Sequence, residues 1–269
     1  MTKQRFMRKC SIFFRTRLKI PFRLHIRNKR IVSPTAPTYV FIHGLADNGS
    51  IWKKIVDRLP SSVNYIVVDL LGHGESLAYA GKVYDANYQA RNVIRTCLGL
   101  GCVGKYIFVG HSFGSIVSVE CAHRYIATKR LVLCSLPLYN GSENKAEKRL
   151  FDAYNKALKH PEIITLAYRL ANKSHIIGGE SQTTLNKESL PIFQETLHSG
   201  IMNQKTQSRM LSLKMPIDII YGRFDPLLVA KNIKSLPKRS NINITAINSD
   251  HSPRSIMFKA ALTCLSKDW

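Results

Sequence analysis

Three side chains in this chain of 269 residues have the types and the order needed for nucleophilic catalysis by a serine. Ser112 lies in a GHSFG sequence at 110–114, which fits the pattern G-x-S-x-G, and Asp225 and His251 follow it. A serine hydroxyl is a weak nucleophile until a base removes its proton, and an acid that orients the histidine supports that transfer. The order Ser112, Asp225, His251 therefore predicts acyl transfer through a catalytic triad.

The serine stands where a strand pattern changes into a helix pattern. The apolar run at 105–110 predicts a buried strand, and the apolar spacing over 113–125 predicts a helix. Glycines flank the serine because larger side chains on such a sharp turn would collide with the neighbouring strands and helix. The helix N-terminus also favours developing negative charge. The context predicts a nucleophile elbow; the alternative is a tight glycine-rich turn without chemistry.

The expected acid and base each follow a predicted strand in the last quarter of the chain. A structural interpretation competes with each role, since His251 could be an ordinary surface histidine and Asp225 could cap a helix that begins near Pro226. Asp250 is a rival acid, but its side chain should diverge from that of its neighbour His251. We expect Asp225 to orient His251.

An oxyanion hole needs two converging N–H donors. We expect one from Phe113, directly after the nucleophile, and one from Leu45, in the loop after the first strong strand, where Gly44 allows close approach of the backbone. The other histidines lack the spacing of metal ligands, among them His73, His111 and His123. We expect His73 in a turn and His123 on a helix surface, and neither a metal nor a cofactor.

These residues need a framework of alternating strands and helices, and the sequence predicts one. Continuous apolar runs predict buried strands at 38–43, 64–70, 105–110, 130–135, 216–221 and 242–248. Helical patterns fall between or after them at 50–59, 84–98, 113–125, 227–236 and about 252–265. Such alternation indicates an α/β fold whose parallel sheet is covered on both faces. Residues 18–26 alternate between apolar and mostly basic side chains, which predicts an edge strand.

The alternation stops over residues 140–212, where only helical patterns occur. We therefore expect an α/β core of residues 18–139 and 213–269, a helical cap or lid at 140–212, and a basic N-terminal extension at 1–17. Several apolar residues of the expected cap would favour a hydrophobic acyl group if they line the cleft rather than only bury the cap. They are Phe151, Tyr154, Leu158, Ile163, Ile164, Leu166 and Tyr168.

The chain resembles the α/β-hydrolase family, in the branch of small esterases with a GHSxG elbow. The motifs that carry this resemblance are His43-Gly44, DLLGHGES at 69–76, GHSFG at 110–114, GRFDP at 222–226, and His251. The resemblance implies a mostly parallel sheet of eight strands whose second strand is antiparallel, with residues 18–26 in an N-terminal hairpin. It also implies a cap inserted before the strand at 216–221.

The leading hypothesis is a serine hydrolase that cleaves a small-molecule carboxylic ester or thioester. Serine at position 112 argues against dehalogenase and epoxide hydrolase chemistry, which this fold runs with an aspartate nucleophile. Hydrolysis of a carbon–carbon bond with the same triad is the alternative within the enzyme class. The positive charge also raises the hypothesis of anionic substrates, such as acyl groups on an acidic carrier protein.

The net charge of +23 raises a hypothesis of a different class. Residues 1–31 hold 11 Lys and Arg and no acidic residue, so this arm could recruit a scaffold or binding protein to nucleic acid or membrane. The plainer interpretation is a solubilising N-terminus.

No apolar run approaches the roughly 18 residues of a membrane span, and none suits a signal peptide. The six cysteines form no CxxC pair, and we expect a cytoplasmic protein with reduced thiols, an organellar transit peptide being the alternative.

Overall fold

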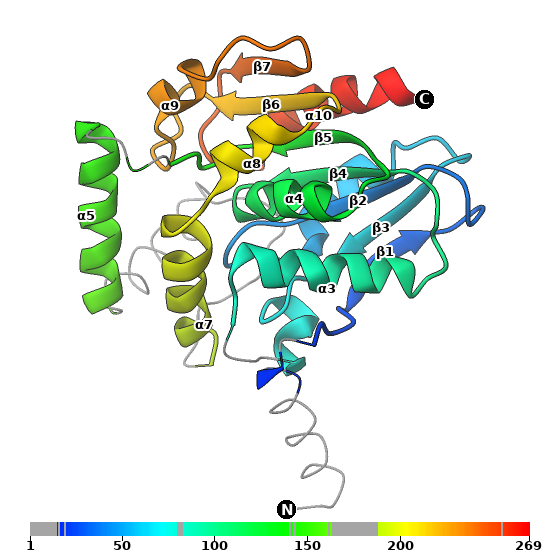
Figure 1. Cartoon of the computed structure of the whole chain (residues 1–269), viewed down its shortest axis with the longest axis horizontal. Helices are drawn as coiled ribbons and strands as arrows, with labels where there is room; N and C mark the ends of the chain where they lie inside the picture. Colours follow the sequence, from blue (N-terminus) through cyan, green and yellow to red (C-terminus); the bar gives the residue numbers. More distant parts are fainter. Residues whose placement is uncertain are drawn as a thin grey trace, which may run out of the picture.

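The computed structural model describes residues 15, 17–18, 20–79, 83–139, 141, 144–160, 162, 188–253 and 255–269. Within this part of the chain, seven strands form one sheet with helices on both faces (Figure 1). The strands are β1 (Ile26–Arg30), β2 (Thr38–Ile42), β3 (Asn64–Val68), β4 (Tyr106–His111), β5 (Thr128–Cys134), β6 (Ile217–Gly222) and β7 (Ile242–Ile247). Their order across the sheet is β1-β3-β2-β4-β5-β6-β7.

All neighbouring strands pair in parallel except β1, which runs antiparallel to β3 at the edge. The predicted α/β class and its mostly parallel sheet are therefore confirmed. The described residues contain seven strands, one fewer than the resemblance implies. Parallel pairing brings the carboxyl ends of β2 to β7 to one edge of the sheet, where a ligand site is expected.

The edge strand predicted at 18–26 is wrong in position, because β1 begins only at Ile26. The alternation correctly places Phe22 and Leu24 inside, each with 5% of its surface exposed. Their N–H groups do not pair with a strand, however. Phe22 donates to Asn92 Oδ1 at 2.7 Å and Leu24 donates to Thr96 Oγ1 at 2.8 Å. Side chains of a helix thus replace a partner strand, which an alternation of side chains cannot reveal.

Two apolar cores cover the two faces of the sheet. Helices α3 (Ala86–Leu98) and α4 (Phe113–Arg124) pack on one face, and α2 (Lys53–Val56) and α10 (Ser255–Leu265) contribute to the core on the other. Short elements complete this part: η1 (Gly49–Trp52), η2 (Gly74–Tyr79), α9 (Ala230–Lys234) and η4 (Ser266–Asp268). Five cysteines lie among the described residues, and all five are buried and free.

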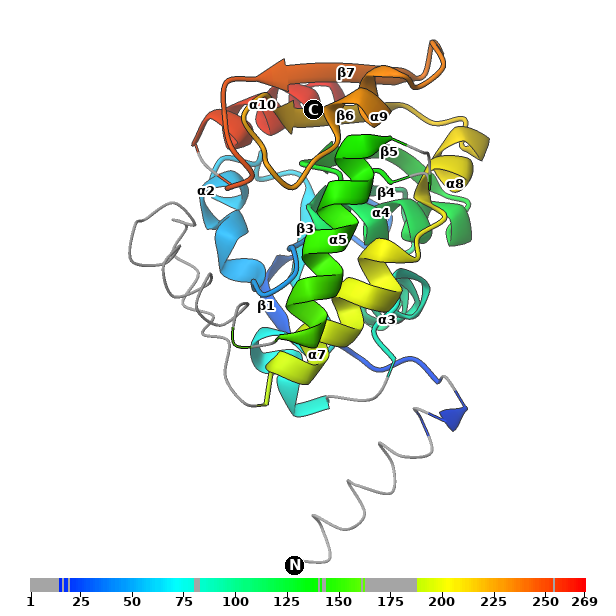
Figure 2. The ribbon, with the colours of Figure 1, turned by 90° about the vertical axis from the view of Figure 1, so that its left-hand side faces the viewer.

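Helices are the secondary structure of the described residues between β5 and β6. They are α5 (Lys145–Lys159), α7 (Leu190–Glu195), the π-helix η3 (Thr196–Met202) and α8 (Thr206–Ser212). Helices α5 and α7 lie side by side at one end of the molecule (Figure 2), and Gln194 Nε2 donates to Leu158 O at 3.0 Å. Ile163, Ile164, Leu166 and Tyr168 lie outside the described residues. No helix in the described ranges is both long and apolar enough for a membrane span.

Candidate active site

Ser112 occupies the turn between β4 and α4 in a conformation that few residues other than glycine adopt. Its φ is 53° and its ψ is −121°. A Cβ added at Gly110 would overlap the carbonyl of Gly114, and one added at Gly114 would overlap the carbonyl of Ile42. The strained backbone therefore depends on both glycines of the motif. It leaves Ser112 at the carboxyl end of the central strand.

Two hydrogen bonds bring the predicted acid and base to the serine. His251 Nε2 lies 2.8 Å from Ser112 Oγ, although 139 residues separate them. His251 Nδ1 lies 2.7 Å from Asp225 Oδ2. The second carboxylate oxygen of Asp225 accepts the N–H of Leu227 at 2.9 Å. Asp225 therefore combines the two roles that its sequence left open, since it caps the following turn and also contacts the histidine.

The loop after β2 approaches the nucleophile closely. A Cβ added at Gly44 would lie 3.1 Å from the Cβ of Ser112, a tight contact, so glycine favours this close approach of the backbone. Phe113 is the first residue of α4, and its N–H therefore belongs to the unpaired first turn of the helix. These positions are compatible with N–H groups of Leu45 and Phe113 that converge above Ser112.

His43 fixes the peptide group between Gly44 and Leu45. The N–H of Leu70 donates to His43 Nε2 at 2.9 Å, so the proton of the neutral ring is on Nδ1. Nδ1 lies 2.7 Å from the carbonyl oxygen of Gly44 and donates to it. The N–H of a trans peptide points away from its carbonyl. By holding the carbonyl, His43 thus directs the Leu45 N–H to the opposite side.

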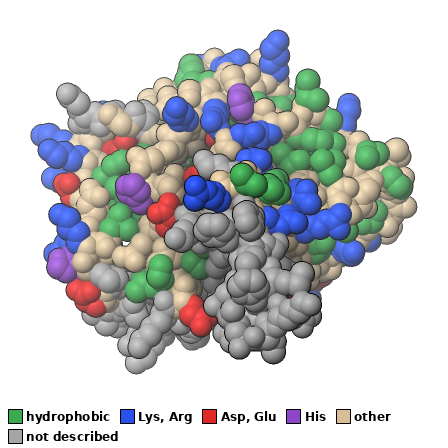
Figure 3. Space-filling model, turned by 60° about the horizontal axis from the view of Figure 1, so that its bottom comes forward, with side chains coloured by type: hydrophobic (Ala, Val, Ile, Leu, Met, Phe, Trp, Pro, Cys, Tyr) green, Lys and Arg blue, Asp and Glu red, His purple; other side chains and the backbone are tan. Residues whose placement is uncertain are grey.

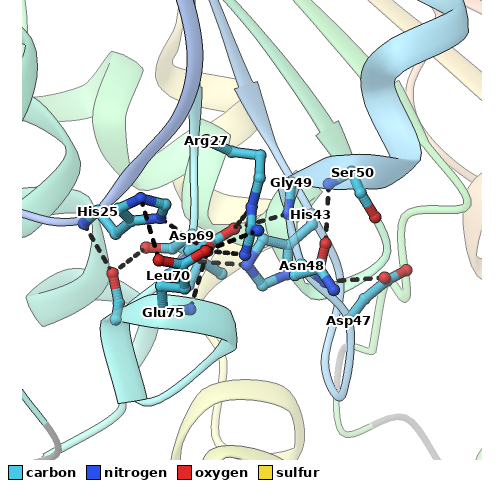
Figure 4. A network of polar contacts seen from close by, with 11 residues as sticks. His25, Arg27, His43, Asp47, Asn48, Gly49, Ser50, Asp69, Leu70 and Glu75 are labelled. Atoms are coloured by element: carbon cyan, nitrogen blue, oxygen red, sulfur yellow. Dashed lines mark hydrogen bonds and ion pairs between the residues drawn. The ribbon is translucent and has the colours of Figure 1, made fainter. Parts of the chain in front are cut away.

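A buried carboxylate, Asp69, anchors the other end of the same loop (Figure 4). Its oxygens accept the N–H of Gly49 at 2.8 Å and that of Glu75 at 3.0 Å, and Arg27 pairs with it at 2.5 Å. Burial alone would raise the pKa of Asp69, but the Arg27 hydrogen bond and the two N–H donors lower it to about 2. Asp69 is therefore ionised, and it links β1, β3 and the Gly44–Gly49 loop.

His111, the neighbour of the nucleophile, contacts the main chain of His251. Its Nε2 lies 2.9 Å from the His251 carbonyl oxygen, which can only accept, so His111 donates. Burial, with the positive charge of a protonated His251, lowers the pKa of His111 to about 3 and keeps the ring neutral. Its Nδ1 is buried and has no hydrogen-bond partner among the described residues. His111 therefore holds the backbone of the residue that carries the base.

The sequence interpretation missed the supporting residues His43, His111 and Asp69. His43 and Asp69 stood in quoted motifs, but their partners are remote in the chain. His73 lies in a turn, as expected, and is buried with its ring centroid 5.4 Å from that of His43. Burial lowers the pKa of His73 to about 3. His123 is exposed on α4, as predicted.

The family model described as the alpha/beta hydrolase family matches residues 39–201, which is more than half of the chain. The chain belongs to the alpha/beta hydrolase family. Lipase LipV of Mycobacterium tuberculosis is 36% identical over 100 residues, which cover 37% of this chain and 36% of the relative. Pimeloyl-[acyl-carrier protein] methyl ester esterase of Vibrio vulnificus is 24% identical over 234 residues, which cover 81% and 88% of the two chains.

Solved structures of the hydrolase family share the fold at low sequence identity. A thermophilic esterase from Thermogutta terrifontis has a TM-score of 0.66 at 20% identity, with 87% of this chain and 89% of that chain covered. An epoxide hydrolase from Bacillus megaterium has a TM-score of 0.66 at 16% identity, with 91% and 95% covered. These neighbours show that the chain shares their fold, and their names include an esterase and an epoxide hydrolase, which are different hydrolytic chemistries.

Proposed function

We propose that the protein is a serine hydrolase that cleaves a carboxylic ester or thioester through an acyl-enzyme. The observation that carries this proposal is the unbroken hydrogen-bond path from Ser112 Oγ through the His251 ring to Asp225. A serine on an elbow with a base and an orienting acid in this geometry is suited to acyl transfer. Serine in place of an aspartate nucleophile separates the chain from the epoxide hydrolases that share its fold.

In the proposed mechanism, Ser112 Oγ attacks the carbonyl carbon while His251 Nε2 takes the hydroxyl proton. The carbonyl electron pair moves onto the oxygen, and the N–H groups of Leu45 and Phe113 stabilise that oxyanion. His251 then gives the proton to the leaving alcohol or thiol, and the acyl-enzyme forms. Water, deprotonated by His251, attacks the acyl carbon. The bond from that carbon to Ser112 Oγ then breaks, His251 returns the proton to Oγ, and the acid leaves. Asp225 holds the imidazole in the required tautomer and stabilises its cationic form.

We further propose that residues 140–212 act as a cap over a cleft for an apolar acyl group. A cavity of about 760 Å³ lies between α5, η3 and α8. Tyr139, Phe151, Met202 and Leu211 are among the residues that line it. Phe151 is one of the apolar residues that would favour a hydrophobic acyl group if they line the cleft. Polar residues such as Gln204 and Lys205 also line this cavity, and Ser112 does not, so the proposed apolar acyl site depends on the substrate panel described below.

A second candidate substrate is an acyl group carried by an acidic protein. Seven exposed basic side chains lie on α5 and α9: Lys145, Lys148, Arg149, Lys156, Lys159, Lys231 and Lys234. A hydrogen bond of 3.3 Å between Asn144 and Asn232 joins the two helices, and Asp152 is the exposed acid on α5. Figure 3 shows Lys and Arg along the left-hand edge, the side on which α5 lies in Figure 1. The name of the Vibrio vulnificus relative includes an acyl-carrier protein.

A contact of residues 1–31 with an anionic surface stays a prediction. Residues 1–14 lie outside the described residues. Two basic residues of the arm serve the fold itself, since Arg27 pairs with Asp69 and Arg30 Nε donates to the Val63 carbonyl at 3.2 Å. If the arm recruits the protein, deletion of residues 1–17 should abolish salt-sensitive retention on DNA or anionic vesicles. Unchanged retention would remove this role.

A substrate panel tests the proposed function. It combines p-nitrophenyl esters of increasing acyl length, acyl thioesters free and bound to a carrier protein, and a β-diketone with a hydrolysable carbon–carbon bond. We expect ester or thioester turnover that rises with acyl length. A carrier-bound substrate should lose turnover at high salt while a p-nitrophenyl ester does not. Turnover of the β-diketone alone would favour carbon–carbon hydrolysis, and flat activity across acyl lengths would contradict an apolar acyl site.

A further inference from the structure

A buried tyrosine outside the triad contacts the loop that carries Asp225. Tyr139 follows β5, where the chain leaves the sheet, and only 3% of its surface is exposed. Its hydroxyl donates to the carbonyl oxygen of Leu227 at 2.7 Å. The N–H of the same Leu227 donates to Asp225 Oδ1 at 2.9 Å. Tyr139 thus holds the carbonyl of Leu227, and the N–H of Leu227 in turn contacts the carboxylate of Asp225.

A second tyrosine connects this contact to helix α5. Tyr154 OH lies 3.1 Å from Tyr139 OH. A hydroxyl has one proton, and that of Tyr139 is committed to Leu227, so Tyr154 is the donor between the two. Burial raises the pKa of both hydroxyls, that of Tyr154 to about 12, so both remain protonated near neutral pH. The result is a directed path from α5 to the loop after β6.

Helix α5 is docked around this contact through one face. Glu147, Phe151 and Tyr154 are four and three residues apart, so they share a side of the helix. Buried Glu147 accepts from Asn232 Nδ2 at 2.6 Å and from the Gly141 N–H at 2.7 Å. The ring of Phe151 meets that of Tyr139 edge to face, with centroids 5.2 Å apart. The position of Tyr154 therefore follows the docking of α5.

We propose that Tyr139 is a positioning residue for Asp225, and that Tyr154 makes this support depend on the docking of α5 against the core. The path runs from Tyr154 to Tyr139, to Leu227, to Asp225 and on to His251. The inference rests on the proposed function, because it needs Asp225 to act on His251. It predicts that displacement of α5, by a substrate or a partner, weakens the alignment of the acid.

The first test replaces Tyr139 by Phe and measures turnover of the best p-nitrophenyl ester. The Leu227 carbonyl loses its donor, and we expect kcat to fall about tenfold, as the loss of one buried hydrogen bond allows, with KM unchanged. Tyr106→Phe is the matched control, because Tyr106 OH also donates to a buried carbonyl, that of Cys102 at 2.6 Å, far from this loop in the fold. An equal fall in both variants, or no fall in Tyr139→Phe, would overturn the proposal.

The second test replaces Tyr154 by Phe, which removes the hydroxyl and keeps the partly buried aromatic ring. This variant also tests the proposal if the Tyr139 variant does not fold. We expect kcat to fall about threefold in the otherwise unchanged protein and by nothing further in the Tyr139→Phe background, because Tyr154 acts through Tyr139. Independent, additive effects would reject the path. In proton NMR spectra, the chemical shift of the downfield His251 Nδ1–H resonance should change in both variants and be unchanged in Tyr106→Phe.

The outcomes separate this proposal from the proposed function. If Ser112→Ala retains wild-type ester turnover, the proposed function fails and takes the inference with it. If Ser112→Ala is inactive but Tyr139→Phe retains the wild-type kcat and the His251 proton resonance, the inference alone fails.

Discussion

His111 donates its Nε2–H to the main-chain carbonyl oxygen of His251, 2.9 Å away. The residue directly before the nucleophile thus holds the backbone of the residue proposed as its base. The two ring centroids lie 5.3 Å apart. Because Ser112 and His111 are adjacent on the elbow, one rigid turn sets both the position of the nucleophile and that of the base. This is a reason for histidine at the second position of the GHSFG motif.

Replacement of His111 by alanine should therefore disturb the base without touching the substrate. The His251 carbonyl would lose its donor, and we expect kcat/KM to fall about tenfold and stability to fall by about 1–3 kcal/mol. His111→Gln, whose amide can reach the same carbonyl, should recover most of the activity. Steady-state kinetics and urea unfolding of the two variants provide the measurement. Equal activity of His111→Ala and the wild type would contradict this role.

His43 should stabilise the transition state more than the ground state, because it orients a proposed oxyanion donor. Removal of its ring frees the Gly44 carbonyl and with it the direction of the Leu45 N–H. We expect His43→Phe to lower kcat about tenfold to a hundredfold with little change in KM, within the range for one oxyanion donor. His73→Asn is the control, because buried His73 contacts the Leu71 carbonyl instead. A fall confined to KM would indicate that His43 serves only substrate binding.

Acid should destabilise the fold through two buried histidines. The pKa values of His73 and His111 lie at about 3, below the ordinary 6.5. Below about pH 6.5 the unfolded chain takes up protons that the folded chain does not, so stability is complete above that pH and falls as the pH drops. At pH 5 the loss is about 2 kcal/mol for each histidine. Asp69, with a pKa of about 2, contributes no change in this window.

Urea unfolding at pH 7.5 and pH 5 measures this loss. His111→Gln should lose about 2 kcal/mol less than the wild type over that interval, since one of the two histidines is gone. His123→Gln, at an exposed position on α4, is the control and should behave as the wild type. If His111→Gln keeps the full pH dependence of the wild type, His111 is not buried as the structure has it.

The sequence predicted those features of the fold and site that local patterns encode. The GHSFG motif stands between a strand and a helix, so the elbow at Ser112 followed from neighbours in the chain. Continuous apolar runs located β2 to β7 to within about two residues. The bonds from Ser112 to His251 and from His251 to Asp225 agree with the order of the three residues, although they join distant segments.

Contacts between remote side chains could not be predicted in the same way. The alternation at 18–26 is that of a strand, yet Asn92 and Thr96 satisfy its backbone and the true strand starts later. No local pattern connects His111 to a carbonyl 140 residues away or Tyr139 to one 88 residues away. These partners depend on the assembled sheet, which brings the ends of several strands to one edge.

The central claim is that Ser112 is the nucleophile, and covalent labelling tests it most directly. The wild-type protein should react with a fluorophosphonate probe, gain one adduct by intact mass, and carry that adduct on the peptide that contains Ser112. Ser112→Ala, with an unchanged circular dichroism spectrum, should gain none. Equal labelling of Ser112→Ala, or an adduct mapped to another residue of the wild type, would contradict the account.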